Sequence, residues 1–255
     1  MFKSLFVILL MVFFIAIIFW IIYFGTFINI SVFKLRYRII SLFSTPEKMD
    51  KLNQESIKRA KEDKKEIMII IHGAAANYHK DVYGTALWFK EQGVNAVSFD
   101  YDYKSLPDIS AKKLSLYIDD ILKQTGTEKV NIVGFCLGGN LAEYYAEKFG
   151  GSKKMNKLIT VLSPLRPMPS TGIFYEIDKL MSFNPDPWNE VLSYMQDKTP
   201  VFDTLRVYGK KDIIVPTKYQ IPDKGDSIGL DLGHSPLISV DPEILNLVQN
   251  FINKN

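Results

Sequence analysis

Short apolar segments alternate with helix-like segments from residue 66 to residue 252, and this alternation limits the folds open to the chain. Each apolar segment is nearly continuous and is bounded by glycine or polar turn residues, as buried strands are. The alternation predicts an α/β fold with a doubly wound, mostly parallel sheet, in which ligands bind beyond the carboxyl ends of the strands. The expected strands are 66–73, 94–100, 129–134, 157–163, 202–209 and 226–233, and the expected helices are 81–92, 109–124, 141–149 and 242–252.

The N-terminal part of the chain has a different character. No Asp, Glu, Lys, Arg or His occurs over 4–33, and the apolar run continues to about residue 30. A helix needs roughly 20 residues to cross a bilayer core, so residues 5–24 are enough for one span. A cleaved signal peptide has a shorter apolar core, about 7–15 residues, and a small-residue cleavage site that this segment lacks. We therefore expect a transmembrane anchor over 1–33, in contact with the bilayer through residues 5–30.

Basic residues are more frequent after the predicted anchor than before it. Lys3 precedes the span, whereas Lys34, Arg36, Arg38 and Lys48 follow it. The positive-inside rule then favours a cytoplasmic location for the body of the chain.

Residues 34–65 form the expected connection between the anchor and a body over 66–255. Apolar and basic residues alternate at 31–43, which fits either an amphipathic helix lying on the headgroups or the end of the span with a linker. The charge-rich segment 46–65 predicts a solvated helix or tether.

Residues 165–200 interrupt the alternation with a long connection rich in proline and aromatic side chains. A connection of this length is uncommon unless it has a function. We interpret it as a lid-like insert lining an apolar acyl site; the alternative is a helical excursion with a small core of its own.

Charge and cysteine content exclude several classes of function. The net charge is only +3 and no basic block is interleaved with aromatic residues, so we expect no nucleic-acid partner. The sequence has no Cys/His spacing typical of zinc sites, and nothing in it implies a metal or an organic cofactor. Cys136 is the only cysteine, which excludes an internal disulfide.

The segment VNIVGFCLGGN at 130–140 carries the first candidate for chemistry. An apolar strand meets Gly134, Cys136 follows two residues later, and a helical pattern comes next. This is the pattern of a nucleophile elbow, a sharp strand-to-helix turn that presents one side chain at its tip. Gly134 and Gly138 are the small residues that such a turn needs, and a helix N-terminus favours a thiolate. The alternative is a buried structural cysteine beside a glycine-rich packing turn.

A loop directly after the first strand of the body carries the second candidate. It reads His72-Gly73-Ala74, and its small residues allow a close approach to a substrate. An oxyanion hole combines the N–H after the nucleophile with an N–H from an early strand–helix loop. We therefore expect the backbone N–H groups of Leu137 and Ala74 to be the donors. His72 is expected to be structural, with its ring bonded to nearby loop backbone.

An acid and a histidine follow at the ends of later strands. Asp212 comes just after the strand 202–209, and His234 follows the last strand. The order nucleophile, acid, histidine is that of hydrolases built on this architecture. His234 would take the thiol proton and Asp212 would orient its ring. Other histidines and acids are weaker candidates by position: His79, Asp100, Asp102, Asp226 and Asp231.

Taken together, residues 66–255 resemble the α/β-hydrolase superfamily. HGAAAN (72–77) with the elbow and the Gly-His pair at 233–234 resembles compact bacterial lipases and esterases, which carry serine at the position of Cys136. TGTEKVNIVGFCLGG (125–139) with GKKDIIVP (209–216) is also similar to polyhydroxyalkanoate synthases, which carry cysteine there, as dienelactone hydrolases do. The resemblance implies a triad of Cys136, Asp212 and His234 with oxyanion donors at Ala74 and Leu137.

These features together predict a membrane-anchored acyl hydrolase. Its substrate would be a small ester or thioester with an apolar, lipid-like acyl group. One alternative is an acyltransferase similar to the polyhydroxyalkanoate synthases that uses acyl-CoA. An alternative of another class is a non-catalytic binding module of the same fold at the membrane.

Overall fold

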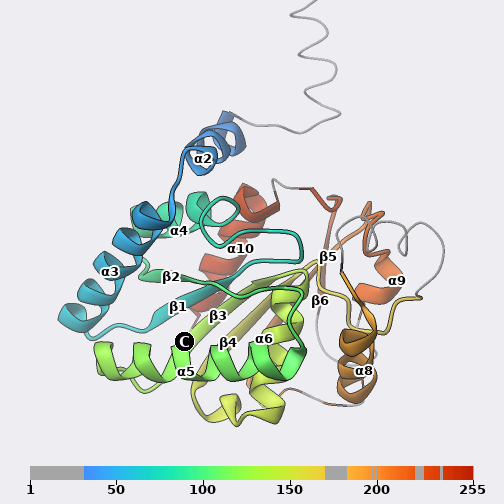
Figure 1. Cartoon of the computed structure of the whole chain (residues 1–255). Helices are drawn as coiled ribbons and strands as arrows, with labels where there is room; N and C mark the ends of the chain where they lie inside the picture. The colour runs from blue at the N-terminus through green and yellow to red at the C-terminus, as the bar shows by residue number, and fades with distance from the viewer. Residues whose placement is uncertain are drawn as a thin grey trace, which may run out of the picture.

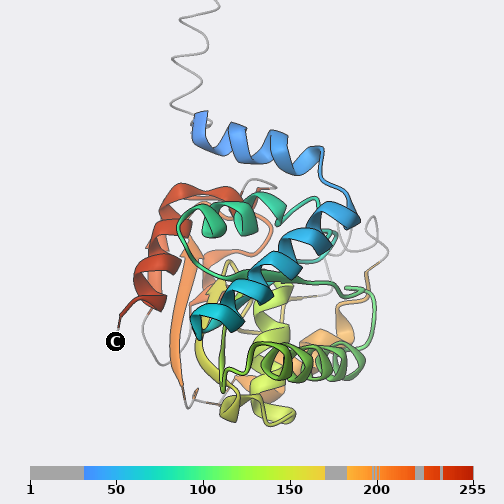
Figure 2. The same ribbon diagram turned by 90° about the vertical axis from the view of Figure 1, so that its left-hand side faces the viewer.

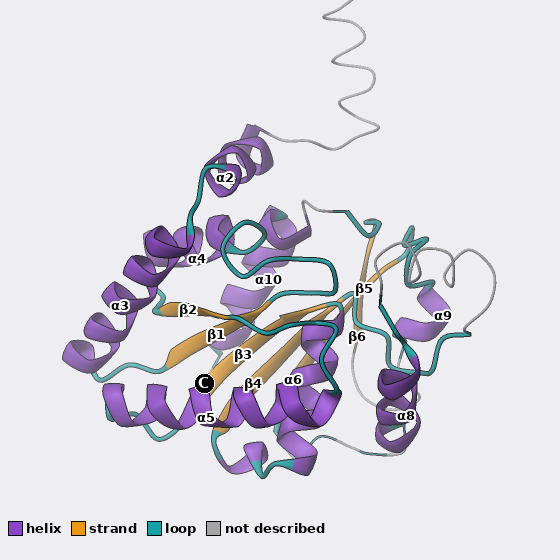
Figure 3. Ribbon diagram, viewed as in Figure 1, coloured by secondary structure: helices purple, strands orange, loops and turns teal. Residues whose placement is uncertain are grey.

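The computed structural model of the chain contains one six-stranded sheet in which every neighbouring pair of strands is parallel (Figures 1 and 3). The structure describes residues 32–169, 183–196, 198, 200, 202–221, 227–235 and 238–254. The strand order β2-β1-β3-β4-β5-β6 places the first strand of the body inside the sheet and confirms the predicted parallel α/β architecture. The strands are β1 Ile67–Ile71, β2 Ala96–Phe99, β3 Val130–Phe135, β4 Met155–Val161, β5 Asp203–Gly209 and β6 Ser227–Leu230.

Helices cover both faces of this sheet, which explains the continuous apolar runs. In Figure 1, α4 (Tyr83–Glu91) and α10 (Pro242–Ile252) lie on one side, and α5 (Pro107–Thr125) and α6 (Leu137–Lys148) lie on the other. All five residues of β1 are buried: Ile69 packs in the core under α5 and α6, whereas Met68 packs in the core under α4 and α10. A strand buried on both faces has no solvent-facing position, so period-2 alternation is absent.

The charged segment 46–65 folds into α3 (Pro46–Asp63), which is a helix as predicted but is not solvated all round. Thr45 caps its start by accepting a hydrogen bond from Lys48 N–H, and Pro46 occupies the first turn. The inward face buries four apolar side chains and Asn53, whose amide group exchanges two hydrogen bonds with the backbone of Ser98. Because β2 is an edge strand, this contact satisfies polar groups that the sheet leaves open.

Helix α2 (Val32–Leu42) lies outermost, across α4 on the side away from the sheet (Figure 2). Residues 1–31, which include nearly all of the predicted anchor, are outside the described part of the chain. None of the helices within the described ranges combines the length and the apolar character needed to cross a bilayer.

The remaining short helices lie in the connecting segments of the chain. They are η1 (Gly151–Lys153), directly before β4, and α8 (Asp186–Met195), α9 (Thr217–Gln220) and η2 (Ile238–Val240), which come after the carboxyl ends of β4, β5 and β6. Helix α8 is the described helical part of the insert predicted at 165–200, whose residues 170–182 lie outside the described ranges.

Candidate active site

Cys136 lies at the tip of a sharp turn between β3 and α6. Its backbone has φ 49° and ψ −121°, a region that side chains rarely adopt, and α6 begins at the next residue. Two hydrogen bonds hold this conformation: Cys136 N–H donates to the Val161 carbonyl at 2.8 Å, and Gly139 N–H donates to the Cys136 carbonyl at 3.0 Å. The residue is partly exposed and lines a pocket.

Two glycines allow α6 to start this close to the sheet. A Cβ on Gly134 would lie 2.4 Å from the Gly139 nitrogen, and a Cβ on Gly138 would lie 2.5 Å from the backbone oxygens of β1 and His72. The sequence pattern predicts that this helix starts at residue 141, because the two glycines before it have low helix propensity. The structure begins it at Leu137, since the packing between α6 and β1 requires those glycines.

Asp212 follows β5 and accepts four hydrogen bonds through its buried carboxylate. Oδ1 accepts from the backbone N–H groups of Ile214 and Val215, each at 2.9 Å. Oδ2 accepts from Gln220 Nε2 and lies 2.9 Å from His234 Nδ1. The carboxylate is therefore fixed by its own turn and presents one oxygen to the histidine ring.

Gln220 is a site residue that the sequence did not indicate. Its side chain is buried in α9, donates to Asp212 and to the Val215 carbonyl, and accepts from Gly209 N–H at 3.1 Å. A lone glutamine eight positions after the aspartate has no recognisable pattern. Only the fold of the 209–220 connection brings the two side chains together.

The other acids considered from the sequence that lie in the described ranges have partners other than His234. Asp231 forms an exposed ion pair with Lys211, and the exposed Asp100 lies 4.0 Å from His72 Nε2. Asp102 bonds the Lys104 backbone, and Asp226 is outside the described residues. His79 is buried beside Ser44, in the contact between α2 and the loop before α4.

The charges around His234 favour its protonated form. Burial acts to lower the pKa of the ring, but the charge and hydrogen bond of the Cys136 side chain and the carboxylate of Asp212 outweigh it and raise the pKa to about 10. Nδ1 of the ring lies 2.9 Å from Asp212, and the Cys136 side chain, which lines the same pocket, contributes to the raised pKa of this imidazole. At neutral pH this histidine carries a positive charge next to the sulfur.

The loop after β1 lies directly against the Cys136 turn. A Cβ on Gly73 would be 3.1 Å from Cβ of Cys136, so the glycine permits this contact. Ala74 follows it, and Leu137, as the first residue of α6, has a backbone N–H without an intrahelical partner. His72 Nδ1 lies 2.9 Å from the Gly73 carbonyl, which is the loop contact expected from the sequence, and burial lowers the pKa of its stacked ring.

These groups open onto a pocket of about 260 Å³ whose lining is mostly apolar. Pro164 and Met168 come from the segment after β4, α8 supplies one wall, and the turn after Asp212 supplies another. The Asn189 side chain ties α8 to the segment after β4, because its amide donates a hydrogen bond to the Met168 carbonyl and accepts one from the Met168 N–H. The pocket lining consists of Ala74, Cys136, Leu137, Pro164, Met168, Phe183, Pro185, Trp188, Asn189, Leu192, Ile214, Val215 and His234.

Within the described ranges, no group of three or more His, Cys, Asp or Glu side chains is arranged to hold a metal ion. The chemical groups at the pocket are a thiol, an imidazole, a carboxylate and backbone N–H donors. This set can carry out nucleophilic acyl transfer without further components.

Comparison with known proteins supports the architecture. Residues 66–189 match a family model described as alpha/beta hydrolase fold. A search of curated proteins finds no significant match.

Several solved structures share the fold at low sequence identity. A lipase from Bacillus licheniformis in its mature form superposes with a TM-score of 0.60 at 13% identity, covering 73% of this chain and 91% of the lipase. An alpha/beta hydrolase enzyme from a Moroccan lagoon-sediment metagenome gives 0.52 at 18% identity, covering 73% and 90%. A thermophilic esterase from Thermogutta terrifontis gives 0.50 at 13% identity, covering 73% and 89%. At these identities the likeness establishes the fold.

Proposed function

We propose that this chain, which has the α/β-hydrolase fold and matches a family model of that fold over residues 66–189, is an acyl hydrolase with a Cys136–His234–Asp212 triad. The observation that carries the proposal is the His234 ring, whose Nδ1 lies 2.9 Å from Asp212 and which lines the same apolar pocket as Cys136. Each of the three residues comes from the carboxyl end of a different strand, where this architecture places its ligands.

The proposed reaction uses each group for one step. The Cys136 sulfur, as thiolate, attacks the carbonyl carbon of an ester or thioester and forms a C–S bond. The negative charge that develops on the carbonyl oxygen is held by the N–H groups of Leu137 and Ala74. His234 then gives its proton to the departing alcohol or thiol, and a thioester acyl-enzyme remains. Water, deprotonated by His234, releases the acid and restores the thiol.

The lining of the pocket supports an apolar acyl group as the substrate portion that binds there. Each CH₂ group of an acyl chain that becomes buried in the pocket stabilises the complex by about 0.8 kcal/mol. Apart from Cys136 and His234, two of the described lining residues carry polar side-chain atoms. Both ends of the Asn189 amide are bonded to the Met168 backbone, and Trp188 contributes a single buried indole N–H. A small ester or thioester of lipid-like character therefore fits better than a sugar or a peptide.

Mass spectrometry with substrate analogues tests this proposal. Full-length protein is incubated with p-nitrophenyl esters of increasing acyl length, and both nitrophenol release and the mass of the Cys136 peptide are followed. We expect turnover and an acyl mass on Cys136, and we expect Cys136→Ala to abolish both. Full turnover by Cys136→Ala on every ester would refute the mechanism. The conservative variant Cys136→Ser reports whether the geometry supports an oxygen nucleophile.

Transfer of the acyl group to an acceptor other than water is a second candidate function, and a cysteine at position 136 favours it. A cysteine nucleophile exchanges one thioester for another when it takes an acyl group from acyl-CoA, and the bond type is conserved. Assays with acyl-CoA separate the candidates: a hydrolase releases free acid and CoA in equal amounts, whereas a transferase retains the acyl group until an acceptor, such as a hydroxyacyl compound, is supplied. Absence of any adduct on Cys136 with all substrates would favour a non-catalytic binding module of the same fold.

We also propose that residues 1–33 anchor the protein in a membrane, with the body on the cytoplasmic side. The uncharged run over 4–33 and the basic residues after it support this. The full chain should remain in the membrane fraction after alkaline carbonate washing and should resist protease added outside intact cells. Release by carbonate would contradict the anchor, and cleavage in intact cells would contradict the orientation.

A further inference from the structure

Helix α2 packs a mixed face, with Tyr37 in the apolar core and Lys34 and Ser41 in polar contacts, against the protein, and a second, apolar face points outward. Of its eleven residues, the three that are buried are Lys34, Tyr37 and Ser41. A surface helix of a globular protein ordinarily buries its apolar stripe and exposes its polar residues. Helix α2 buries Tyr37 but leaves a second set of apolar side chains exposed, and the body of the protein does not cover them.

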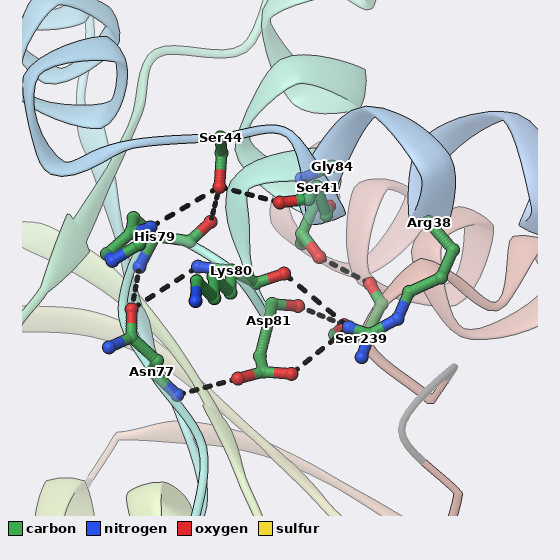
Figure 4. Close-up of polar contacts among 10 residues, drawn as sticks. Arg38, Ser41, Ser44, Asn77, His79, Lys80, Asp81, Gly84 and Ser239 are labelled. Carbon is green, nitrogen blue, oxygen red and sulfur yellow. Dashed lines mark hydrogen bonds and ion pairs between the residues drawn. The ribbon is translucent and has the colours of Figure 1, made fainter.

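The inward face of α2 is held by specific polar contacts. Lys34 forms a buried ion pair with Asp241 at the start of α10. Arg38 lies 3.1 Å from an Asp81 oxygen, and Ser41 Oγ accepts a hydrogen bond from Gly84 N–H at 2.8 Å (Figure 4). A Cβ on Gly84 would be 2.7 Å from the Tyr37 carbonyl, so this glycine permits the close approach of α4. These contacts fix the rotation of α2 about its axis.

The outward face of α2 and the turn after it is a continuous apolar stripe. Its exposed fractions are 86% for Val32, 49% for Leu35, 45% for Ile39, 55% for Leu42 and 72% for Phe43. The spacing of three, four and three residues places the first four on one side of a helix, and Phe43 extends the same side. Five of the twelve exposed large hydrophobic residues in the described part of the chain lie in this short segment. We call these five residues the α2 stripe.

The chemistry around the α2 stripe indicates what covers it. The 4–33 segment, which contains no charged residue, leads directly into the start of the helix, so the apolar part of the chain that lies outside the structure ends at the stripe. Exposed basic side chains border it: Arg36, 58% exposed, and Lys48, which bonds the Phe43 carbonyl. An apolar face rimmed by cations matches the boundary between acyl chains and anionic headgroups.

We propose that α2 is an interfacial helix that lies flat on a lipid bilayer, with the α2 stripe inserted among the headgroups and first acyl carbons. The inference goes beyond the proposed anchor, because it assigns a second, surface-lying contact to described residues. It is also independent of the proposed chemistry at Cys136. The proposal implies that the body has a fixed orientation on the membrane. The polar contacts of α2 with α4 and α10 hold the body close to the bilayer, so it does not hang on a flexible linker.

Site-specific fluorescence in vesicles tests the proposal on the full-length chain. An environment-sensitive NBD label is placed on Ile39→Cys in a Cys136→Ser background, and the protein is reconstituted into phosphatidylcholine–phosphatidylglycerol vesicles. The matched control carries the label on Leu116→Cys, since Leu116 is exposed to a similar degree on α5, at 64%. Nitroxide quenchers are built into the lipids either near the headgroup or deep in the acyl chain.

We expect the label at position 39 to shift its emission to shorter wavelength and to be quenched more by the shallow nitroxide than by the deep one. The label at position 116 should retain the emission it has in water. A water-like, unquenched label at position 39 would overturn the proposal. A blue-shifted but unquenched label would also overturn the proposal. It would mean that the α2 stripe is covered by the apolar N-terminal segment of the chain or by a second copy of the protein. Stronger quenching by the deep nitroxide would also overturn the proposal, because α2 would then lie within a span.

A charge variant gives a second measurement that does not depend on labelling the centre of the stripe. Leu35→Glu with Ile39→Glu changes exposed side chains only, so the far-UV circular dichroism and the unfolding midpoint should be retained. A label on Leu42→Cys should lose its shallow quenching in this variant and keep it in the parent. Unchanged quenching would contradict insertion of the α2 stripe.

Discussion

His234 is the residue on which the candidate chemistry depends, because it bonds Asp212 and lines the same pocket as Cys136. Burial alone would act to lower the pKa of its ring. The pKa is instead raised to about 10, so the positive charge is a property of the folded site. A single residue therefore links stability and proposed reactivity to pH.

The pH dependence of stability follows from the raised pKa of His234. Because the folded value, about 10, lies above the ordinary 6.5, the protonated ring stabilises the folded state fully below pH 6.5, and this contribution is lost as the pH rises through 10. We expect the wild-type chain to exceed His234→Gln in free energy of unfolding at pH 6 and to lose that advantage by pH 10. Urea titrations of both proteins at the two pH values measure this. An advantage that grows with pH would contradict the charged form.

Gln220 is a positioning residue for Asp212 rather than a group that touches a substrate. Removing its amide in Gln220→Ala leaves the Gly209 N–H without its buried acceptor and takes one donor from Asp212, so we expect a loss of about 1–3 kcal/mol in stability. We also expect kcat to fall with KM little changed, since the pocket wall is intact. Denaturant titration and steady-state kinetics on the proposed ester substrates measure the two effects. Gln220→Glu is the control that keeps an acceptor for Gly209 but removes the donor to Asp212, so its kcat should fall as in Gln220→Ala. A kcat equal to that of the wild type in Gln220→Glu would contradict the role of the amide donor.

At the scale of elements, the β3–α6 turn shows why an unfavourable local sequence is retained. Paired glycines weaken a helix start, and the φ of Cys136 is strained for a side chain. Both costs are offset by the packing of α6 directly on β1. The sulfur and the Leu137 N–H then lie at the end of the sheet, where the His72–Gly73 loop also ends.

Gly138→Ala tests this packing. The added Cβ would meet the backbone of β1 and His72 at 2.5 Å, and neither can move without displacing the strand, so we expect a destabilisation of about 1–3 kcal/mol. Turnover should fall further than stability alone explains, because α6 and its first N–H must shift. Gly126→Ala is the control. Its Cβ meets nothing within 4 Å, so its positive φ should lower stability without changing turnover. Equal turnover in both variants would contradict the role of the packing.

The attachment of α2 makes a different prediction at the same scale. Lys34→Met leaves the Asp241 carboxylate buried without its partner, which ordinarily costs about 3–5 kcal/mol. Arg36→Met removes an exposed ion pair with Glu91, which contributes only about 0–1 kcal/mol. Unfolding of the two full-length variants in urea compares them. Similar stabilities would mean that the Lys34 pair does not hold α2 to the body.

For the whole molecule, the pocket is the feature that joins distant parts of the chain. Its walls come from the loop after β1, the Cys136 turn, the segment after β4, α8 and the turn after β5. Parallel strands bring their carboxyl ends to one edge of the sheet, so the insert at α8 lies over the proposed triad. The size of this pocket then limits the acyl chain that can be buried.

Acyl-chain selectivity tests that statement. Each buried CH₂ contributes about 0.8 kcal/mol, so kcat/KM for p-nitrophenyl esters should rise roughly fourfold per CH₂ until the pocket is filled. Leu192→Trp, in the α8 wall, should end this rise at a shorter chain. Tyr194→Trp, on the exposed side of the same helix, should leave the series unchanged. A series that ends at the same length in Leu192→Trp would place the acyl chain elsewhere.

Much of the fold was predictable because buried strands and helix faces have strong local patterns. The five buried residues of β1 and the Leu114 and Ile118 face of α5 are apolar in the periods that sheets and helices require. The strand order was not predicted, because which strands pair is decided by contacts between distant segments. The face of α3 was not predicted either, because its buried Asn53 is polar and its role depends on the edge strand that it meets.

The sequence by itself determined the parallel α/β architecture and the residues to consider at the site, because periodicity and the order nucleophile, acid, histidine are local or sequential properties. Only the tertiary structure decided that Gln220 holds Asp212 and that α2 turns an apolar face outward. The physical reason is the same for both. They depend on distances between side chains from separate segments, and these are fixed by the packing of the whole sheet and its helices.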